Sequence, residues 1–148
     1  MAYNTQLKLD NNWHVETEEY VDDLGADITE LSVSHFIDDE KHEDCHAEIS
    51  VGPLPEEITA EDEAFANYVD LVGFSDDEQE NPIRKEKFNN KSAFLFDAEN
   101  EDGSLMRVIC YEARKECLAV VTVYAINEEI LEKAVSTIEK GLRISLSE

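Results

Sequence analysis

The residues best suited to chemistry gather between positions 35 and 46. This stretch holds three of the four histidines, one of the three cysteines and five carboxylates. Imidazole and thiolate are ligands that transition metals prefer, so His42, Cys45 and His46 are candidate metal ligands. His42 and His46 would share a face only in a helix, whereas the alternating pattern around them predicts strands. The spacing therefore favours an acidic hairpin connection with incidental histidines, and we expect no metal and no cofactor.

A second acidic pattern, from Asp97 to Gly103, resembles the start of a calcium-binding loop. Its glycine stands one place too late, and the position of the bidentate ligand falls on Val108. The Asp102-Gly103 pair is typical of a tight hairpin turn. We therefore expect a turn here rather than a calcium site.

The sequence shows no nucleophile beside a base. A Gly-x-Ser-x-Gly motif is absent, and the five glycines stand at predicted turns or helix ends, not in a phosphate-binding loop. Cys110 alternates with apolar residues in a predicted strand, which is typical of a small core residue and not of a reactive thiol. We predict that the protein is not an enzyme.

The elements that must position these residues follow from the apolar periodicity. Alternation with a period of two predicts strands, and the segment 118–126, apolar on both sides, is typical of a central strand. Residues 17–25 fit either a short helix or an acidic loop. The predicted strands are 7–16, 28–37, 47–51, 83–88, 93–98, 105–111, 118–126 and a terminal strand or tail at 142–146.

Two helices are predicted between these strands. The first begins after Thr59, has acidic residues in its first turn and ends at Gly73. Its apolar stripe is Phe65, Tyr68, Val69 and Val72. The second begins at Asn127 and ends at Gly141. Its apolar stripe is Ile130, Leu131, Ala134, Val135 and Ile138.

Short connections between the strands predict antiparallel pairing. We therefore expect a single α+β domain spanning residues 1–148. Its antiparallel sheet would have about six strands and be flanked by the two main helices, resembling an α/β/α sandwich.

The charge of the chain is very uneven. The net charge is −24, and the first 80 residues carry −22 of it. Such a charge argues against nucleic acid and anionic membranes as partners, and it favours a basic protein.

The candidate partner-binding residues are Asp38, Asp39, Glu40, Asp76, Asp77, Glu78 and Trp13. Trp13 also fits a half-buried aromatic residue at the end of the sheet. The basic cluster Arg84, Lys85, Lys87 and Lys91 is typical of a protected edge strand.

The sequence favours a cytoplasmic location without membrane attachment. An odd number of cysteines fits reduced thiols, and the first residues lack the basic and apolar regions of a signal peptide. The longest nearly unbroken apolar run, 117–126, is shorter than the roughly 20 residues that a membrane span needs.

In the predicted layout, an early tryptophan follows a first strand (7–13), a hairpin leads to a helix (61–72), a meander follows (88–125), and a closing helix leads into a short strand (130–144). This layout resembles the Mog1/PsbP-like fold of small bacterial proteins. The resemblance implies an antiparallel sheet sandwiched by helices, without a catalytic site common to the fold. Members of that family act by binding: one group engages a small GTPase, and another docks on a photosynthetic complex.

Three functions remain open from the sequence, and all are binding functions. The leading hypothesis is a non-enzymatic interaction domain whose acidic surface engages a basic protein. The second is an acidic inhibitor or immunity-type protein that masks a cationic site. The third is a small acidic secretion-type chaperone, which is less favoured because such chaperones tend to begin with a helix.

Overall fold

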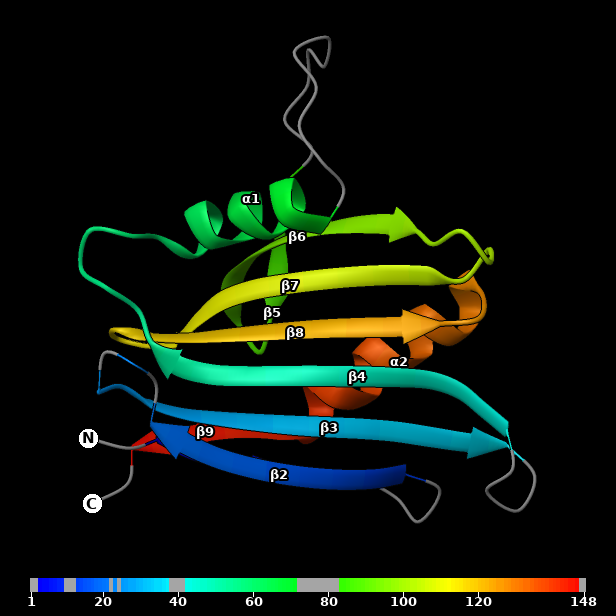
Figure 1. Cartoon of the computed structure of the whole chain (residues 1–148), viewed down its shortest axis with the longest axis horizontal. Helices are drawn as coiled ribbons and strands as arrows, with labels where there is room; N and C mark the ends of the chain where they lie inside the picture. Colours follow the sequence, from blue (N-terminus) through cyan, green and yellow to red (C-terminus); the bar gives the residue numbers. More distant parts are fainter. Residues whose placement is uncertain are drawn as a thin grey trace, which may run out of the picture.

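Figure 1 shows the computed structural model of the chain, which describes residues 3–9, 13–21, 23, 25–37, 42–71 and 83–146. A seven-stranded antiparallel sheet has the strand order β2-β3-β4-β8-β7-β6-β5. Its strands are β2 (Trp13–Val21), β3 (Asp27–Ile37), β4 (His42–Pro53), β5 (Arg84–Phe88), β6 (Lys91–Glu99), β7 (Leu105–Arg114) and β8 (Cys117–Ala125). A second antiparallel sheet pairs β1 (Tyr3–Leu7) with β9 (Leu142–Leu146).

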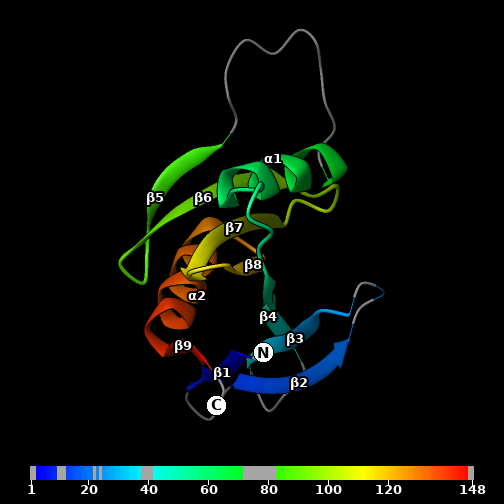
Figure 2. The same ribbon diagram turned by 90° about the vertical axis from the view of Figure 1, so that its left-hand side faces the viewer.

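The two helices lie on opposite faces of the large sheet (Figure 2). Helix α1 (Ala60–Leu71) packs on β6 and β7, while α2 (Glu128–Gly141) packs with the small sheet on the other face. The expected α+β class is confirmed. The expectation of about six strands is only approximate, because the described residues form nine strands that divide between two sheets. Since α1 covers only part of its face, the β2-β3-β4 part of that face lacks a helix among the described residues.

Strand β8 occupies the middle of the large sheet, as its apolar sequence predicts. Five of its side chains, at alternate positions, are buried against α2; they are Cys117, Ala119, Val121, Val123 and Ala125. The intervening side chains are partly buried on the α1 face. Burial on both faces explains why this strand shows no polar alternation.

Helix α2 begins and ends as its sequence predicts. The Asn127 side chain accepts a hydrogen bond from the Ile130 backbone N–H at 2.9 Å, which caps the first turn. Leu131, Ala134 and Ile138 are buried, with Ile130 and Val135 partly buried beside them. The helix ends at Gly141, and the chain continues directly into β9.

The start of α1 is predicted correctly, but its buried stripe is predicted only in part, since Tyr68 is buried and Val72 lies outside the described residues. Thr59 and Asp62 exchange backbone and side-chain hydrogen bonds at 3.0 and 3.1 Å, which caps the helix. The buried residues are Ala60, Ala64 and Tyr68, whereas Phe65 and Val69 are exposed. These three buried residues pack in one apolar cluster with Phe96 of β6 and Val108 of β7. The expected end at Gly73 lies outside the described residues.

The N-terminal prediction is also corrected. Residues 17–21 are neither helix nor loop, because they continue β2 in antiparallel register with β3. The strand predicted over 7–16 is divided between β1 and β2, which belong to different sheets. The hairpin of β3 and β4, the meander from β5 to β8 and the closing strand β9 are confirmed. Strand β5 is an edge strand, as its basic cluster predicts.

Candidate functional site: an acidic groove on the open face

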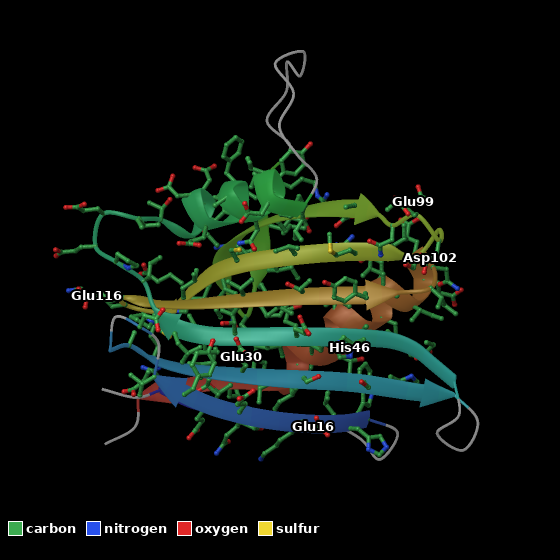
Figure 3. The ribbon with its side chains drawn as sticks, in the orientation of Figure 1. Glu16, Glu30, His46, Glu99, Asp102 and Glu116 are labelled. Atoms are coloured by element: carbon green, nitrogen blue, oxygen red, sulfur yellow. The ribbon has the colours of Figure 1, made fainter. Side chains whose placement is uncertain are left out.

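Three neighbouring strands present glutamates on the same face of the sheet. Across the sheet, Glu16 of β2 is opposite Ser32 of β3, which is opposite Glu48 of β4. In the next row, Glu18 of β2 is directly opposite Glu30 of β3. The four glutamates are exposed, and Figure 3 shows Glu16 and Glu30 on the side of the sheet where α1 lies. We call these four residues and the surface between them the acidic groove.

The acidic groove has a polar floor. Its volume is about 590 Å³. Ser32, Ser50 and Thr122 are half-buried between the glutamates, so hydroxyl groups are available at the base. Its lining residues are Glu16, Thr17, Glu18, Glu30, Leu31, Ser32, Glu48, Ile49, Ser50, Val120 and Thr122. The groove therefore offers carboxylates above hydrogen-bonding groups, which suits a cationic ligand.

The described part of the chain does not pair the acidic groove with lysine or arginine. The Tyr20 hydroxyl donates a hydrogen bond to Glu30 Oε1 at 2.8 Å, but this bond leaves the charge in place. Within the described ranges, no lysine or arginine forms an ion pair with any of the four glutamates. Burial raises the pKa of Tyr124 beside the groove, and the charge of Glu48 adds to this shift. The groove is thus a region of negative potential.

A serine, a histidine and a glutamate adjoin one another at the end of the groove. Ser34 Oγ lies 3.0 Å from His46 Nδ1, and His46 Nε2 lies 3.7 Å from Glu48 Oε1. This order resembles a catalytic triad, but the second distance is too long for a hydrogen bond. Both β3 and β4 are paired on their two sides, so the ladders engage the backbone N–H groups that an oxyanion hole needs. Ser34 and His46 form a cross-strand polar contact, and Glu48 follows His46 two residues along the same strand.

Two of the candidate metal ligands from the sequence, Cys45 and His46, lie on opposite faces of the sheet. Cys45 belongs to the core on the α2 face, whereas the adjacent His46 lies on the groove face (Figure 3). Successive residues of a strand point to opposite faces, so these two side chains cannot share an ion. The side chain of His42 lies outside the described residues. The structure instead brings Cys45 together with His35 and Asp44.

The candidate partner-binding residues are placed only in part. Asp38, Asp39, Glu40, Asp76, Asp77 and Glu78 lie outside the described residues. Trp13 is partly buried against the core on the α2 face, and its ring centroid is 4.7 Å from that of His35. The expectation of a half-buried aromatic residue at the end of the sheet is confirmed. Trp13 therefore lies on the face opposite the acidic groove.

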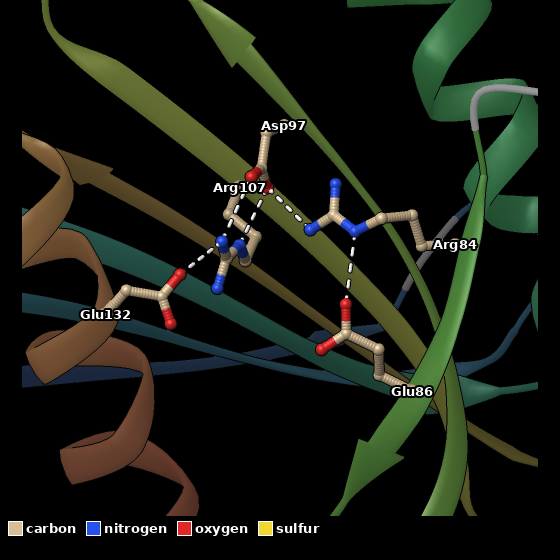
Figure 4. Close-up of polar contacts among 5 residues, drawn as sticks. All are labelled: Arg84, Glu86, Asp97, Arg107 and Glu132. Atoms are coloured by element: carbon tan, nitrogen blue, oxygen red, sulfur yellow. Dashed lines mark hydrogen bonds and ion pairs between the residues drawn. The ribbon is translucent and has the colours of Figure 1, made fainter.

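The calcium-like segment is a hairpin turn, as its Asp-Gly pair predicts. Ser104 donates backbone and side-chain hydrogen bonds to Asp102 Oδ1, and Gly103 has φ of +89°. Asp97, the first acidic residue of the pattern, is bound by Arg107 at 2.7 and 3.0 Å (Figure 4). Since Arg107 occupies both of its oxygens, Asp97 is not available as a calcium ligand.

Two of the three cysteines are poor nucleophiles. Burial raises the pKa of the Cys110 thiol to about 12, and the charge of Glu63 contributes. Burial raises the pKa of Cys117 to about 11. Since the thiolate is the reactive form, these residues act as small core side chains, as predicted for Cys110.

Sequence reasoning did not identify the acidic groove. Glu30 and Glu48 were recognisable as polar strand positions, but Glu18 belonged to a segment interpreted as a helix or loop. Apolar and polar residues alternate only from Trp13 to Glu16, and the pattern breaks down at Glu19 and Tyr20, so the local sequence does not indicate that the strand continues to Val21. Placing Glu18 opposite Glu30 also required the pairing of β2 with β3, which spacing along the chain does not provide.

No protein-family model and no curated protein matches this chain. Among solved structures, the extracellular domain of PknH from Mycobacterium tuberculosis is similar, with 10% sequence identity and a TM-score of 0.31. The match covers 95% of this chain and 81% of that chain. The resemblance to the Mog1/PsbP-like family stays a prediction. Within the part of the chain that the structure describes, no helix is long and apolar enough to cross a membrane.

Proposed function

We propose that this protein is a non-enzymatic interaction domain that engages a basic protein through the acidic groove. The observation that carries the proposal is the direct opposition of Glu18 and Glu30, reinforced by Glu16 and Glu48 on the same face. Like charges directly opposite one another destabilise a sheet. A function that uses the concentrated charge explains why the sheet carries this cost.

A cationic partner would remove the repulsion between these glutamates. Lysine or arginine side chains entering the groove would pair with the carboxylates and hydrogen-bond to the hydroxyls of Ser32, Ser50 and Thr122. The net charge of −24 would steer such a partner toward the protein from a distance. Both effects weaken as salt rises, so the interaction is expected to depend on ionic strength.

A second candidate function is an acidic inhibitor that masks the cationic site of another protein. The observation that favours it is the regular placement of the carboxylates. Glu16 and Glu18 are two residues apart on one strand, hence about 7 Å apart, and the neighbouring strand adds Glu30 at a separation of about 5 Å. A captured partner whose own activity is lost in the complex would identify this function.

The proposal is tested with two doubly substituted proteins that lose the same charge. The groove variant is Glu18→Gln/Glu30→Gln, and the control is Glu56→Gln/Glu57→Gln in the exposed turn after β4. Binding of an oligo-lysine peptide is measured by titration at low and high ionic strength. Lysate proteins retained by each form are also compared at the same two salt concentrations.

We expect the groove variant to bind the peptide roughly 2- to 30-fold more weakly than the control, since exposed ion pairs contribute about 0.2–1 kcal/mol each. The retained lysate protein should likewise be lost from the groove variant and at high salt. The groove variant should also be more stable to urea by about 0.2–1 kcal/mol, because the cross-strand repulsion is removed. Equal binding by both variants, or binding that salt does not weaken, would contradict the proposal.

A further inference from the structure

A β-bulge changes the direction of one side chain at the end of the β3–β4 hairpin. His35 is opposite Cys45 and Phe36 is opposite Glu43, so Asp44 is an extra residue on β4. In a regular strand, Asp44 and Cys45 would point to opposite faces. A bulge redirects side chains in this way and is frequent beside functional sites.

The bulge brings three different metal-binding groups together. The donor atoms of His35, Asp44 and Cys45 all lie within 4.8 Å of one another. His35 Nδ1 and Asp44 Oδ1 are 2.6 Å apart. Cys45 and Asp44 are buried, whereas the His35 side chain is 25% exposed. The cluster is therefore closed toward the core and accessible from solvent beside His35.

We propose that His35, Asp44 and Cys45 form a binding site for a divalent transition-metal ion with the preferences of zinc. Zinc takes nitrogen, sulfur and oxygen ligands at about 2.0–2.3 Å in a tetrahedron, so its ligands are about 3.3–3.8 Å apart. The observed donor atoms need shifts of about 1 Å to reach that geometry. Three protein ligands leave a fourth position for water or another ligand on the exposed side.

The types of ligand decide which ion fits. Thiolate and imidazole select zinc and related transition metals, whereas calcium and magnesium require mainly oxygen ligands. When the ion binds, the Cys45 thiol loses its proton to solvent and His35 binds as neutral imidazole. The ion replaces the hydrogen bond between His35 and Asp44 with two coordinate bonds.

The surroundings hold two of the ligands in place. The Trp13 ring packs on the His35 imidazole at 4.7 Å with an interplanar angle of 49°. The backbone carbonyl of Asp44 accepts a hydrogen bond from the Ile126 N–H at 3.2 Å. Ile126 directly precedes the residue that caps α2, so a bound ion would stabilise the bulge together with the junction between β8 and α2.

This site is separate from the acidic groove. Cys45 belongs to the core on the α2 face, and the groove is on the other face of the same strands. Weak zinc binding by the groove glutamates would not involve sulfur. A measurement that detects the metal–sulfur bond therefore distinguishes the proposed site from the groove.

The test uses tag-free protein that has been dialysed against a chelator and then titrated with Co²⁺. A cobalt–thiolate bond gives a charge-transfer absorption band, and Zn²⁺ should displace the cobalt and abolish it. We expect this band in the wild type and in the control His46→Gln, whose side chain lies on the other face. The band should be absent from Cys45→Ala, and the affinity should fall about tenfold or more in His35→Gln and Asp44→Asn. Zn²⁺ should also raise the unfolding temperature of the wild type but not of Cys45→Ala.

Each of the three ligand residues is substituted separately, so the proposal can still be tested if one variant fails to fold. Folding of each is checked by urea unfolding in the presence of chelator. The absence of a charge-transfer band in the wild type would overturn the proposal, and His35 and Asp44 would then be a hydrogen-bonded pair only. A band that persists in Cys45→Ala, or wild-type affinity in both His35→Gln and Asp44→Asn, would also overturn it.

Discussion

At the scale of single residues, Arg107 donates three hydrogen bonds to carboxylate groups. Its side chain is 11% exposed, and its guanidinium binds Asp97 of β6 through two nitrogens. The same group binds Glu132 of α2 at 2.5 Å (Figure 4). Arg84 extends the network from β5 to Asp97 at 3.3 Å. Arg107 thus connects β6 and β7 to α2, and Arg84 extends this network to the edge strand β5.

Replacing Arg107 should cost more stability than replacing Arg84. Arg107→Ala removes a bidentate contact, leaves Glu132 without this partner and leaves Asp97 with Arg84 alone, whereas the Arg84 side chain is 43% exposed. We expect losses of about 1–2 kcal/mol for Arg107→Ala and below about 1 kcal/mol for Arg84→Ala. Urea unfolding at neutral pH measures both values. Equal losses would show that the network does not depend on Arg107.

The pKa of Asp97 predicts how the network responds to acid. Burial alone would raise this pKa, but the hydrogen bond and charge of Arg107, together with Arg84, lower it below 3.8. A carboxyl group with a lowered pKa contributes stability above its unfolded pKa and loses it as pH falls through the folded pKa. The unfolding free energy of the wild type should therefore exceed that of Asp97→Asn by its largest amount near pH 7. This difference should shrink below about pH 4. A difference that stays constant over this range would contradict the assignment.

At the scale of elements, the junction between α2 and the small sheet depends on a close approach. The Lys8 N–H donates to the Gly141 carbonyl at 3.1 Å, just after β1 ends. A β-carbon at Gly141 would collide with the backbone carbonyl of Lys8. Because this obstacle is backbone and not a flexible side chain, the segment after β1 would have to move.

Gly141→Ala should therefore destabilise the protein although alanine favours helices. We expect a loss of about 1–3 kcal/mol from the steric conflict. Ser136→Ala, at an exposed position of the same helix, is the control and should be neutral or slightly stabilising. Thermal unfolding of the two variants measures the difference. A stabilised Gly141→Ala would show that the small sheet adjusts without cost.

The elements also show where sequence patterns succeed. The cap at Asn127, the apolar stripe of α2 and the central position of β8 were predicted because each depends on neighbours close in the chain. The buried face of α1 is predicted only in part: Tyr68 is buried as expected, but Phe65 and Val69 are exposed, while Ala60 and Ala64 pack on the sheet. Amphipathic spacing favours large residues, whereas packing on β6 and β7 selects the small ones.

At the scale of the whole molecule, the net charge of −24 must cause self-repulsion. The described basic side chains are partly committed to local contacts, such as those of Arg84 and Arg107. The glutamates of the acidic groove lack such contacts among the described residues. Long-range repulsion should therefore be strongest on the half of the protein that contains β2, β3 and β4.

Moderate salt should stabilise this protein. Screening shortens the range of electrostatic repulsion from about 30 Å at 0.01 M to about 10 Å at 0.1 M ionic strength. We expect the unfolding temperature to rise by roughly 2–4 °C over this interval, equivalent to about 1 kcal/mol. The rise should be smaller for Glu18→Gln/Glu30→Gln than for Glu56→Gln/Glu57→Gln. A fall in unfolding temperature with salt would show that attractive pairs dominate.

The sequence by itself determined the α+β class, most strands, both helix starts and the sign of the charge. These features depend on local periodicity, on capping residues and on composition. Only the tertiary structure decided which side chains meet. Glu18 reaches Glu30 through the pairing of β2 with β3, and Asp44 reaches His35 and Cys45 through one bulged residue. A shift of one residue in register moves a side chain to the other face, so neither site can be derived from spacing along the chain.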